Sequence, residues 1–269
     1  MDSAERTKFL PPQPYSNGAS SYRDNHTANM SKPTSYLKYI YVVLGLLVAD
    51  AIISLAFLST MVNFLHTVGG GPYRVFPPNG DSFLMHGEPK GLLTNQGHTT
   101  NGAGGTVVVL LGFGGLIALI KENKSRKKHG KSSPLFTAWA VAVILTWLLI
   151  LAALIYTNVV TKNTSGQSID LDVLALYPYP AKYPLDEWTP ENWYIQVLKL
   201  PLEEGLVQKA IRQNLRVQRG WRYNLIALFI VGFALVVLVV LEVLATRKNR
   251  GRYGRATSGE VEKAREESR

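Results

Sequence analysis

Residues 223–245 read YNLIALFIVGFALVVLVVLEVLA, and this stretch decides the fold. Its only charged residue is Glu242, close to its end. A helix of about 20 mostly apolar residues is long enough to cross the hydrocarbon core of a bilayer. Three further apolar blocks lie at 36–65, 103–120 and 135–160. The four blocks together predict a membrane protein with four transmembrane helices.

The alternative for a single block is a buried helix of a soluble protein, and the short, glycine-rich block at 103–120 fits it best. The other three blocks are long enough to span, so we predict an all-α membrane protein. The first 35 residues are polar and contain prolines, which predicts a disordered tail (1–35) and a first span retained as an anchor. The absence of cysteine excludes disulfides, cysteine-ligated zinc and thiol catalysis.

Basic residues close to the ends of the spans predict the orientation of the chain. The connection 121–134 reads KENKSRKKHGKSSP, and the tail 247–269 begins RKNRGRYGR. Both segments are predicted to be cytoplasmic, which places both termini there and favours contact with anionic lipids. Segments 66–102 and 161–222 then form two outer loops, although three arginines precede the fourth span (223–246). The plasma membrane and the endomembranes are not distinguished by this pattern.

The outer loops carry the signals of a small folded cap, formed mainly by the second loop. YRVF at 73–76 and the alternating segment SIDLDVLAL at 168–176 predict two short strands that pair in a small sheet, and a small β-hairpin is the alternative. Helices are predicted near 190–200 and 202–219, which makes the cap partly helical. The sequon that begins at Asn163 predicts a glycosylated site at the start of the second loop.

The stretch DEWTPENWY at 186–194 contains three carboxylates and three aromatic residues. Thr189 is a good N-cap, Pro190 suits the first helical position, and Glu191 lies in the first turn, where the helix dipole favours an acid. The carboxylates could in principle form an acid–base pair or bind a cation. The helix start already explains them, so we predict no catalytic residue here.

The aromatic residues of this region leave two interpretations open. Trp188, Trp193, Tyr194 and Trp221 form either the core of the cap or a surface that recognises a partner. The chain contains no HExxH, no glycine-rich phosphate loop and no GxSxG, and its five histidines are scattered. We therefore predict neither an enzyme nor a cofactor, a metal site or a nucleic-acid partner.

Two acids lie inside the apolar blocks. Asp50 is near the middle of the first span, and Ser54 and Thr146 are its predicted hydrogen-bond partners. An intramembrane carboxyl of this kind is either a proton or cation site or a neutral bridge between helices. Glu242 is close enough to Arg247 to reach the interface, so we assign it no special role.

Small residues predict close packing between helices. The first span carries the pair Gly45 and Ala49. The second span carries a longer series: Gly112, Gly114, Gly115 and Ala118. These faces pack either within this chain or against a second copy of it.

The plan of short cytoplasmic ends, four spans, a smaller first loop and a larger helical second loop resembles the tetraspanins over residues 36–247. It is also similar to other four-span scaffold families such as the MARVEL proteins. Tetraspanins carry a Cys-Cys-Gly element in the large loop, whereas this chain has no cysteine. The segments DEWTPENWY and RGWRYNL resemble those of uncharacterised four-span proteins of filamentous fungi.

Two functions follow from these patterns as hypotheses. The first is a membrane scaffold that organises a membrane-protein partner through the second outer loop and through helix packing. The alternative is a transporter or channel component in which Asp50 is the intramembrane proton or cation site.

Overall fold

The computed structural model describes residues 35–78, 80–129, 132–184, 186–203 and 205–266. The predicted disordered tail lies, except for Ser35, outside these residues. Among the described residues, four helices are long and apolar enough to cross a membrane: Leu37–Gly69, Asn95–Lys128, Pro134–Asn163 and Leu206–Lys248. The prediction of an all-α, four-span membrane protein is confirmed.

The first two spans contain π-helical segments. Helix α2 (Leu37–Phe64) continues into the π-helical turn η1 (Leu65–Gly69). The second span consists of α3 (Asn95–Thr106), the π-helical η2 (Val107–Phe113) and α4 (Gly114–His129). This helix begins at Asn95, before the predicted span, because a hydropathy pattern does not detect the polar turns that precede the apolar block.

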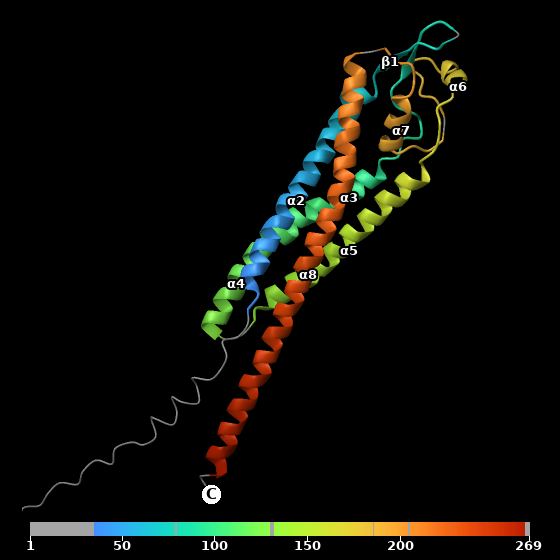
Figure 1. Ribbon diagram of the computed structural model, residues 1–269. Helices are drawn as coiled ribbons and strands as arrows, with labels where there is room; N and C mark the ends of the chain where they lie inside the picture. Colours follow the sequence, from blue (N-terminus) through green and yellow to red (C-terminus); the bar gives the residue numbers. More distant parts are fainter. Residues whose placement is uncertain (1–34, 79, 130–131, 185, 204, 267–269) are drawn as a thin grey trace, which may run out of the picture. The chain divides into compact units, whose positions relative to one another are not determined.

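The third span is α5 (Pro134–Asn163), and the fourth belongs to α8 (Leu206–Glu266). Helix α2 packs against α8 and against α3 with η2, while α5 packs against α8, α3 and α4 (Figure 1). Each span therefore contacts two others. Lipid is as apolar as these side chains, so the association of spans depends on close contact rather than on removal from water.

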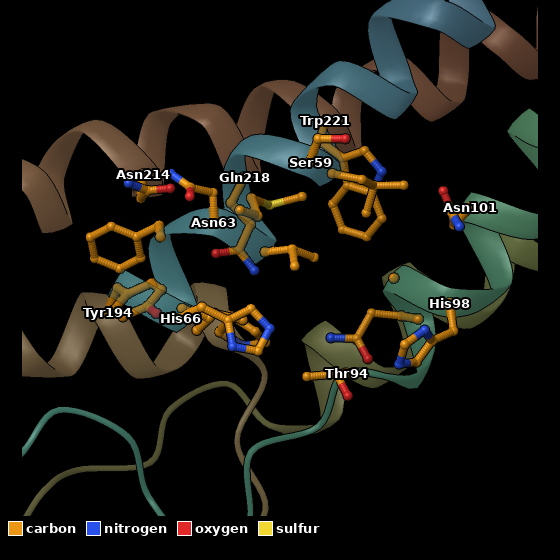
Figure 2. Close-up of a pocket in the computed structure, with 18 residues that line it drawn as sticks. Ser59, Asn63, His66, Thr94, His98, Asn101, Tyr194, Asn214, Gln218 and Trp221 are labelled. Carbon is orange, nitrogen blue, oxygen red and sulfur yellow. The ribbon is translucent and has the colours of Figure 1, made fainter. Parts of the chain in front are cut away.

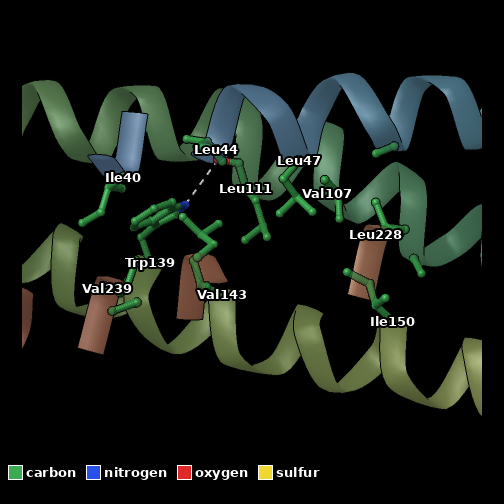
Figure 3. Close-up of a cluster of buried hydrophobic side chains, with 14 of the residues drawn as sticks. Ile40, Leu44, Leu47, Val107, Leu111, Trp139, Val143, Ile150, Leu228 and Val239 are labelled. Carbon is green, nitrogen blue, oxygen red and sulfur yellow. Dashed lines mark hydrogen bonds between the residues drawn. The ribbon is translucent and has the colours of Figure 1, made fainter. Parts of the chain in front are cut away.

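Figure 3 shows the buried hydrophobic side chains of the bundle core, with Trp139 of α5 beside Leu111 of the second span. A Cβ atom at Gly115 would lie 2.8 Å from the Trp139 ring, and a Cβ atom at Gly112 would lie 3.0 Å from Val48. The Trp139 indole N–H donates to the Leu111 carbonyl at 3.4 Å. Glycine at these positions therefore lets α5 and α2 approach the second span.

The other predicted packing residues have different surroundings. Ala118 is fully buried, whereas Gly114 would place a Cβ atom only near the backbone of its own helix. Gly45 and Ala49 are exposed, and a Cβ atom at Gly45 would meet open space. The Gly45–Ala49 pair therefore does not pack against the described part of the chain, and its role in a homo-oligomer stays a prediction.

We call residues 70–94 and 164–205 the cap, and we call the other end of the bundle, which carries 121–133, the basic end. The cap contains an antiparallel pair, β1 (Pro72–Val75) and β2 (Phe83–His86), in which Tyr73 lies opposite Met85. It also contains α6 (Leu171–Ala175) and α7 (Pro190–Val197).

The prediction that 168–176 forms a strand paired with 73–76 is wrong. Strand β1 pairs with β2 of the same loop, and part of 168–176 forms helix α6. The Asp170 carboxylate accepts the Asp172 backbone N–H at 2.9 Å, which caps this short helix. A local side-chain cap thus outweighs a two-residue hydrophobic period that extends over only a few residues.

The two predicted cap helices have different outcomes. The helix near 190–200 is confirmed as α7, with Thr189 as its N-cap and Pro190 in its first turn. The helix near 202–219 is not separate from the fourth span, because α8 runs unbroken from Leu206 through both segments. The junction contains no proline, and the single Gly220 is not enough to end a helix.

A buried ion network closes the basic end of the bundle. The Arg126 guanidinium of α4 bonds the Glu122 carboxylate at 2.6 Å and also bonds the Glu242 carboxylate of α8. It donates as well to the Thr246 hydroxyl at 2.9 Å. Both carboxylates are fully buried. The expectation that Glu242 has no special role is therefore wrong, because its partners come from distant segments.

The same two carboxylates also cap the starts of other spans. Glu122 accepts the Ser133 backbone N–H at 2.6 Å, at the start of α5. Glu242 accepts the Tyr36 backbone N–H at the start of α2. Backbone N–H groups at a helix start have no partner within the helix, and the helix dipole favours an anion there. One network therefore fixes all four spans at this end.

Candidate functional site

The aromatic residues of DEWTPENWY form the core of the cap. Trp188 and Trp193 are fully buried, and Tyr194 is 2% exposed. The Trp188 and Trp193 rings meet edge to face with centroids 5.5 Å apart, and the Trp193 indole N–H donates to the Gly87 carbonyl at 2.7 Å. These rings are therefore packing elements, and the alternative of an exposed recognition surface is wrong for them.

Helix α7 is fixed to two spans by polar contacts. The Asn192 side-chain amide donates to the Thr161 carbonyl at 2.6 Å and to the Thr164 hydroxyl at 2.8 Å, at the end of α5. The buried Glu191 carboxylate lies 3.5 Å from Arg219 and 3.3 Å from Arg222, both on α8. The helix-start residues thus hold α7 in one position above the bundle.

A cavity of about 620 Å³ lies beside α7, between α2, α3 and α8. Figure 2 shows side chains of these four helices and of η1 around the same space. Its apolar wall comes mainly from α2 and η1: Leu58, Met61, Val62, Phe64 and Leu65. Single π-helical turns such as η1 are often found at functional sites.

Two buried donors belong to residues that line this cavity and have no acceptor among the described residues. They are the Tyr194 hydroxyl and the Trp221 indole N–H, and both side chains are more than nine-tenths buried. Burial is the main cause that raises the pKa of Tyr194 well above its usual value, and the charges of Tyr73 and Glu88 act in the same direction. The Tyr194 hydroxyl therefore stays protonated and able to donate.

Two buried acceptors line the same cavity. The Gln96 side chain donates its amide N–H to the Leu93 carbonyl at 2.9 Å, and Asn214 donates to the Ala210 carbonyl at 3.3 Å. The side-chain oxygens of Gln96 and Asn214 are left buried and without a partner. The four residues that carry these unpartnered polar atoms of complementary kinds therefore line one space.

The cavity is electrostatically neutral. None of the residues that the structure places around it is a lysine, arginine, aspartate or glutamate. His66 and His98 are its only imidazoles. A charged ligand would lose its hydration here without gaining a counter-ion, which costs several kcal/mol. The site suits an uncharged molecule with an apolar body and a group that both donates and accepts hydrogen bonds.

The intramembrane candidates do not form the predicted cluster. Asp50 is half-buried and one of its carboxyl oxygens has no partner among the described residues, while its backbone carbonyl accepts from the Asn224 amide at 3.4 Å. The Ser54 hydroxyl is buried and unpartnered, and Thr146 is buried on α5. The predicted bonds from Ser54 and Thr146 to Asp50 are absent from the described structure.

The helical spacing of Asp50 and Ser54 explains why the predicted hydrogen bond between them does not form. Four residues along a helix correspond to a rotation of about 40° beyond a full turn. Ser54 therefore joins Ala51 and Leu58 on the core face, whereas Asp50 lies at the edge of that face, toward Asn224 of α8. The role of Asp50 as a proton or cation site stays a prediction. Asn163 is exposed at the end of α5, and its glycosylation also stays a prediction.

The cavity residues Gln96, Asn214 and Gln218 were not among the sequence candidates. Asn214, Gln218 and Trp221 follow one another at spacings of four and three, which places them on one helical face. That spacing is a usable signal for the α8 wall. Gln96 gave no signal, because it lies in a segment predicted to be a loop.

No protein-family model matches this chain, and no match is found among the curated proteins or among the solved structures. The resemblance to tetraspanins and to fungal four-span proteins stays a prediction. The fold and the site define an α-helical, multi-pass membrane protein with a neutral cavity beneath a folded cap.

Proposed function

We propose that this protein is a non-enzymatic membrane protein that binds an uncharged amphipathic molecule in the cavity beside α7. The ligand class is a neutral lipid with an apolar body and one hydroxyl or amide group. The observation that carries the proposal is the set of four buried, unpartnered polar atoms on residues that line one mostly apolar cavity: Gln96, Tyr194, Asn214 and Trp221.

The free energy of binding favours a ligand that has both apolar and polar surface. A buried polar group without a partner costs about 1–3 kcal/mol, and a ligand that supplies the partner recovers this cost. An apolar molecule alone leaves these atoms unpartnered, and water alone leaves the wall around Leu58 and Phe64 without apolar contact. The volume of about 620 Å³ lies within the usual range for pockets that bind small molecules.

The position of the cavity indicates that the ligand comes from the lipid phase. Part of its wall belongs to the first and second spans, and Val62 of this part is 51% exposed on the bundle surface. A molecule partitioned into the bilayer therefore reaches the wall along α2. The cap covers the polar side through Tyr194 and Pro190.

Photolabelling in proteoliposomes tests this function. A long-chain alcohol that bears a diazirine is expected to label peptides 58–66 and 214–221. The matching carboxylic acid, which is charged at pH 8, is expected to label them at least about tenfold less because burying its charge costs several kcal/mol. Tyr194→Phe should weaken alcohol binding about two- to tenfold, because one hydrogen bond contributes about 0.5–1.5 kcal/mol.

A pair of glycines in α3 provides the matched control. Gly97 lines the cavity, and a Cβ atom there makes ordinary contact with Leu58 at 3.6 Å. Gly102 on the same helix faces open space. Gly97→Leu should fill the cavity and abolish labelling, while Gly102→Leu should preserve it. Equal labelling of both variants, or equal labelling by the alcohol and the acid, would contradict the proposal.

A second candidate function, the organisation of a membrane-protein partner, is favoured by an exposed apolar patch on the cap. We define the patch as Leu84, Leu176 and Tyr179, which are 40%, 74% and 42% exposed. The Tyr179 backbone N–H donates to the Leu84 carbonyl at 2.8 Å, so these two residues are neighbours. This proposal moves the recognition surface from the buried tryptophans to the outside of the cap.

Crosslinking in native membranes tests the second candidate. Leu176→Glu is expected to remove a crosslinked partner, because a charge in an apolar contact loses its hydration. Leu206→Glu is the control, since Leu206 is 85% exposed but lies at the start of α8. The patch is not the docking surface if both variants keep the partner or both lose it.

A further inference from the structure

A second cleft lies on the α5 side of α7 and shares no lining residue with the cavity. Its volume is about 490 Å³, and its walls come from the end of α5, the start of α7 and the middle of α8. Lys162 and Arg222 line it together with one carboxylate, Glu191, and with the polar residues Asn158 and Ser165. It is therefore basic, in contrast to the neutral cavity.

We propose that this cleft binds the phosphate of an anionic phospholipid from the leaflet on the cap side. The ligand's phosphate lies between Lys162 and Arg222, and its acyl chains follow the outer surface of α8. The inference is independent of the neutral-lipid proposal, because the two sites have different walls and opposite requirements for charge.

The charge balance supports an anion. Arg219 and Arg222 share one oxygen of the buried Glu191 carboxylate at 3.5 and 3.3 Å, so that carboxylate orients both guanidinium groups but neutralises only one positive charge. Within the described chain, the Lys162 ammonium group has no carboxylate partner. Among the residues that line the cleft, Lys162 and Arg222 against Glu191 leave an excess of one positive charge, and Arg219 beside Glu191 adds a second.

The apolar surroundings select a lipid over a soluble phosphate. Tyr223 and Ile226 line the cleft and are 61% and 43% exposed on α8. On α5, Ile155 and Val159 are 53% and 49% exposed just before Lys162. The cleft thus lies where the apolar surface of the spans meets charged residues, which is the depth of lipid headgroups. Its Tyr223 is the type of residue enriched at that depth.

The proposed lipid site also explains why Arg219 and Arg222 lie next to the fourth span on the predicted outer side. The orientation rule expects few basic residues next to a span at the predicted outer side, yet Arg219 and Arg222 lie there. One of these two arginines is needed to neutralise Glu191 of α7. The positive charge of the other remains available to bind a lipid phosphate. Near an anionic surface, each basic residue contributes about 1 kcal/mol, which is about a fivefold change in affinity.

Titration of the full-length protein in a neutral detergent tests the site, with binding of phosphatidylglycerol counted by native mass spectrometry. Lys162→Gln should lower the affinity for phosphatidylglycerol about fivefold. Lys209→Gln, an exposed lysine on α8 outside the cleft, is the control for bulk charge and should have no effect. Asn158→Lys adds a cation to the cleft and should raise the affinity by a similar factor.

The comparison of ligands separates the sources of phosphate. Wild-type protein should bind phosphatidylglycerol more tightly than phosphatidylcholine, and millimolar inorganic phosphate should not displace the lipid. Equal affinity for the two lipids would overturn the proposal, as would equal losses in Lys162→Gln and Lys209→Gln. Displacement by inorganic phosphate would also overturn it, because it would assign the cleft to a soluble anion.

Discussion

Replacing Arg126 by methionine should lower the free energy of unfolding of the helix bundle by about 3–5 kcal/mol, because two buried carboxylates then lose their cation. Arg126 bonds both Glu122 and Glu242, and those carboxylates are fully buried at the basic end. The change should appear in reversible unfolding of the reconstituted protein, followed by a spectroscopic probe of helix content.

The control for Arg126→Met is Lys127→Met, which removes an equal charge from the exposed neighbouring residue. A surface change of this kind is expected to stay within about 0.5 kcal/mol. The triple variant that adds Glu122→Gln and Glu242→Gln should recover most of the loss, since amide oxygens still accept the N–H groups at the starts of α2 and α5. Equal stability of Arg126→Met and Lys127→Met would show that the network does not fix the spans.

Replacing Trp193 by alanine should destabilise the cap by about 3–5 kcal/mol, the usual cost of deleting a buried aromatic ring. Trp193 is fully buried between Trp188 and Tyr183 and bonds the Gly87 carbonyl. The apolar core of the cap also includes Phe64 of α2 and Ile211 and Leu215 of α8, and it forms a cluster distinct from the core of the bundle. The variant should therefore insert normally while its cap becomes sensitive to limited proteolysis.

Tyr179→Ala is the matched control for the cap, because this aromatic side chain is 42% exposed. It should leave proteolysis of the cap unchanged. Trp193→Ala should also weaken binding in the cavity, since Tyr194 is positioned by the same helix. Equal protease sensitivity of Trp193→Ala and Tyr179→Ala would contradict the assignment of Trp193 to the core of the cap.

The number of spans was predictable because a long apolar block such as 223–245 depends only on composition and length. Helix α7 was predictable for a different reason, since Thr189 and Pro190 specify a helix start locally. Helix α6 was missed because its cap, Asp170, competed with an alternating pattern of a few residues. A local sequence signal therefore predicted a helix correctly at α7, where no other signal competed with it, and not at α6, where a strand pattern did.

The contacts that matter for function were not predictable, because they join segments distant in the chain. The pair of Arg126 and Glu242 connects the second and fourth spans, and neither residue has a sequence neighbour that indicates the other. The cavity brings together Gln96, Tyr194 and Asn214 from three separate helices. Each of these residues alone has an ordinary explanation, and only their convergence around one space indicates a binding site.

The two ends of the bundle have complementary roles in this account. The ion network of Glu122, Arg126 and Glu242 joins all four spans at the basic end. At the cap end, α7 is fixed to α5 by Asn192 and to α8 by Glu191. Between these two ends lies the cavity, lined by the first two spans, α7 and α8.

Native mass spectrometry of the protein extracted from its own membranes in a mild detergent tests the central claim most directly. Wild-type protein and Gly102→Leu are predicted to carry one bound, uncharged lipid whose mass is absent from Gly97→Leu. The account is contradicted if the three proteins carry the same lipids, or if wild-type protein carries no uncharged lipid.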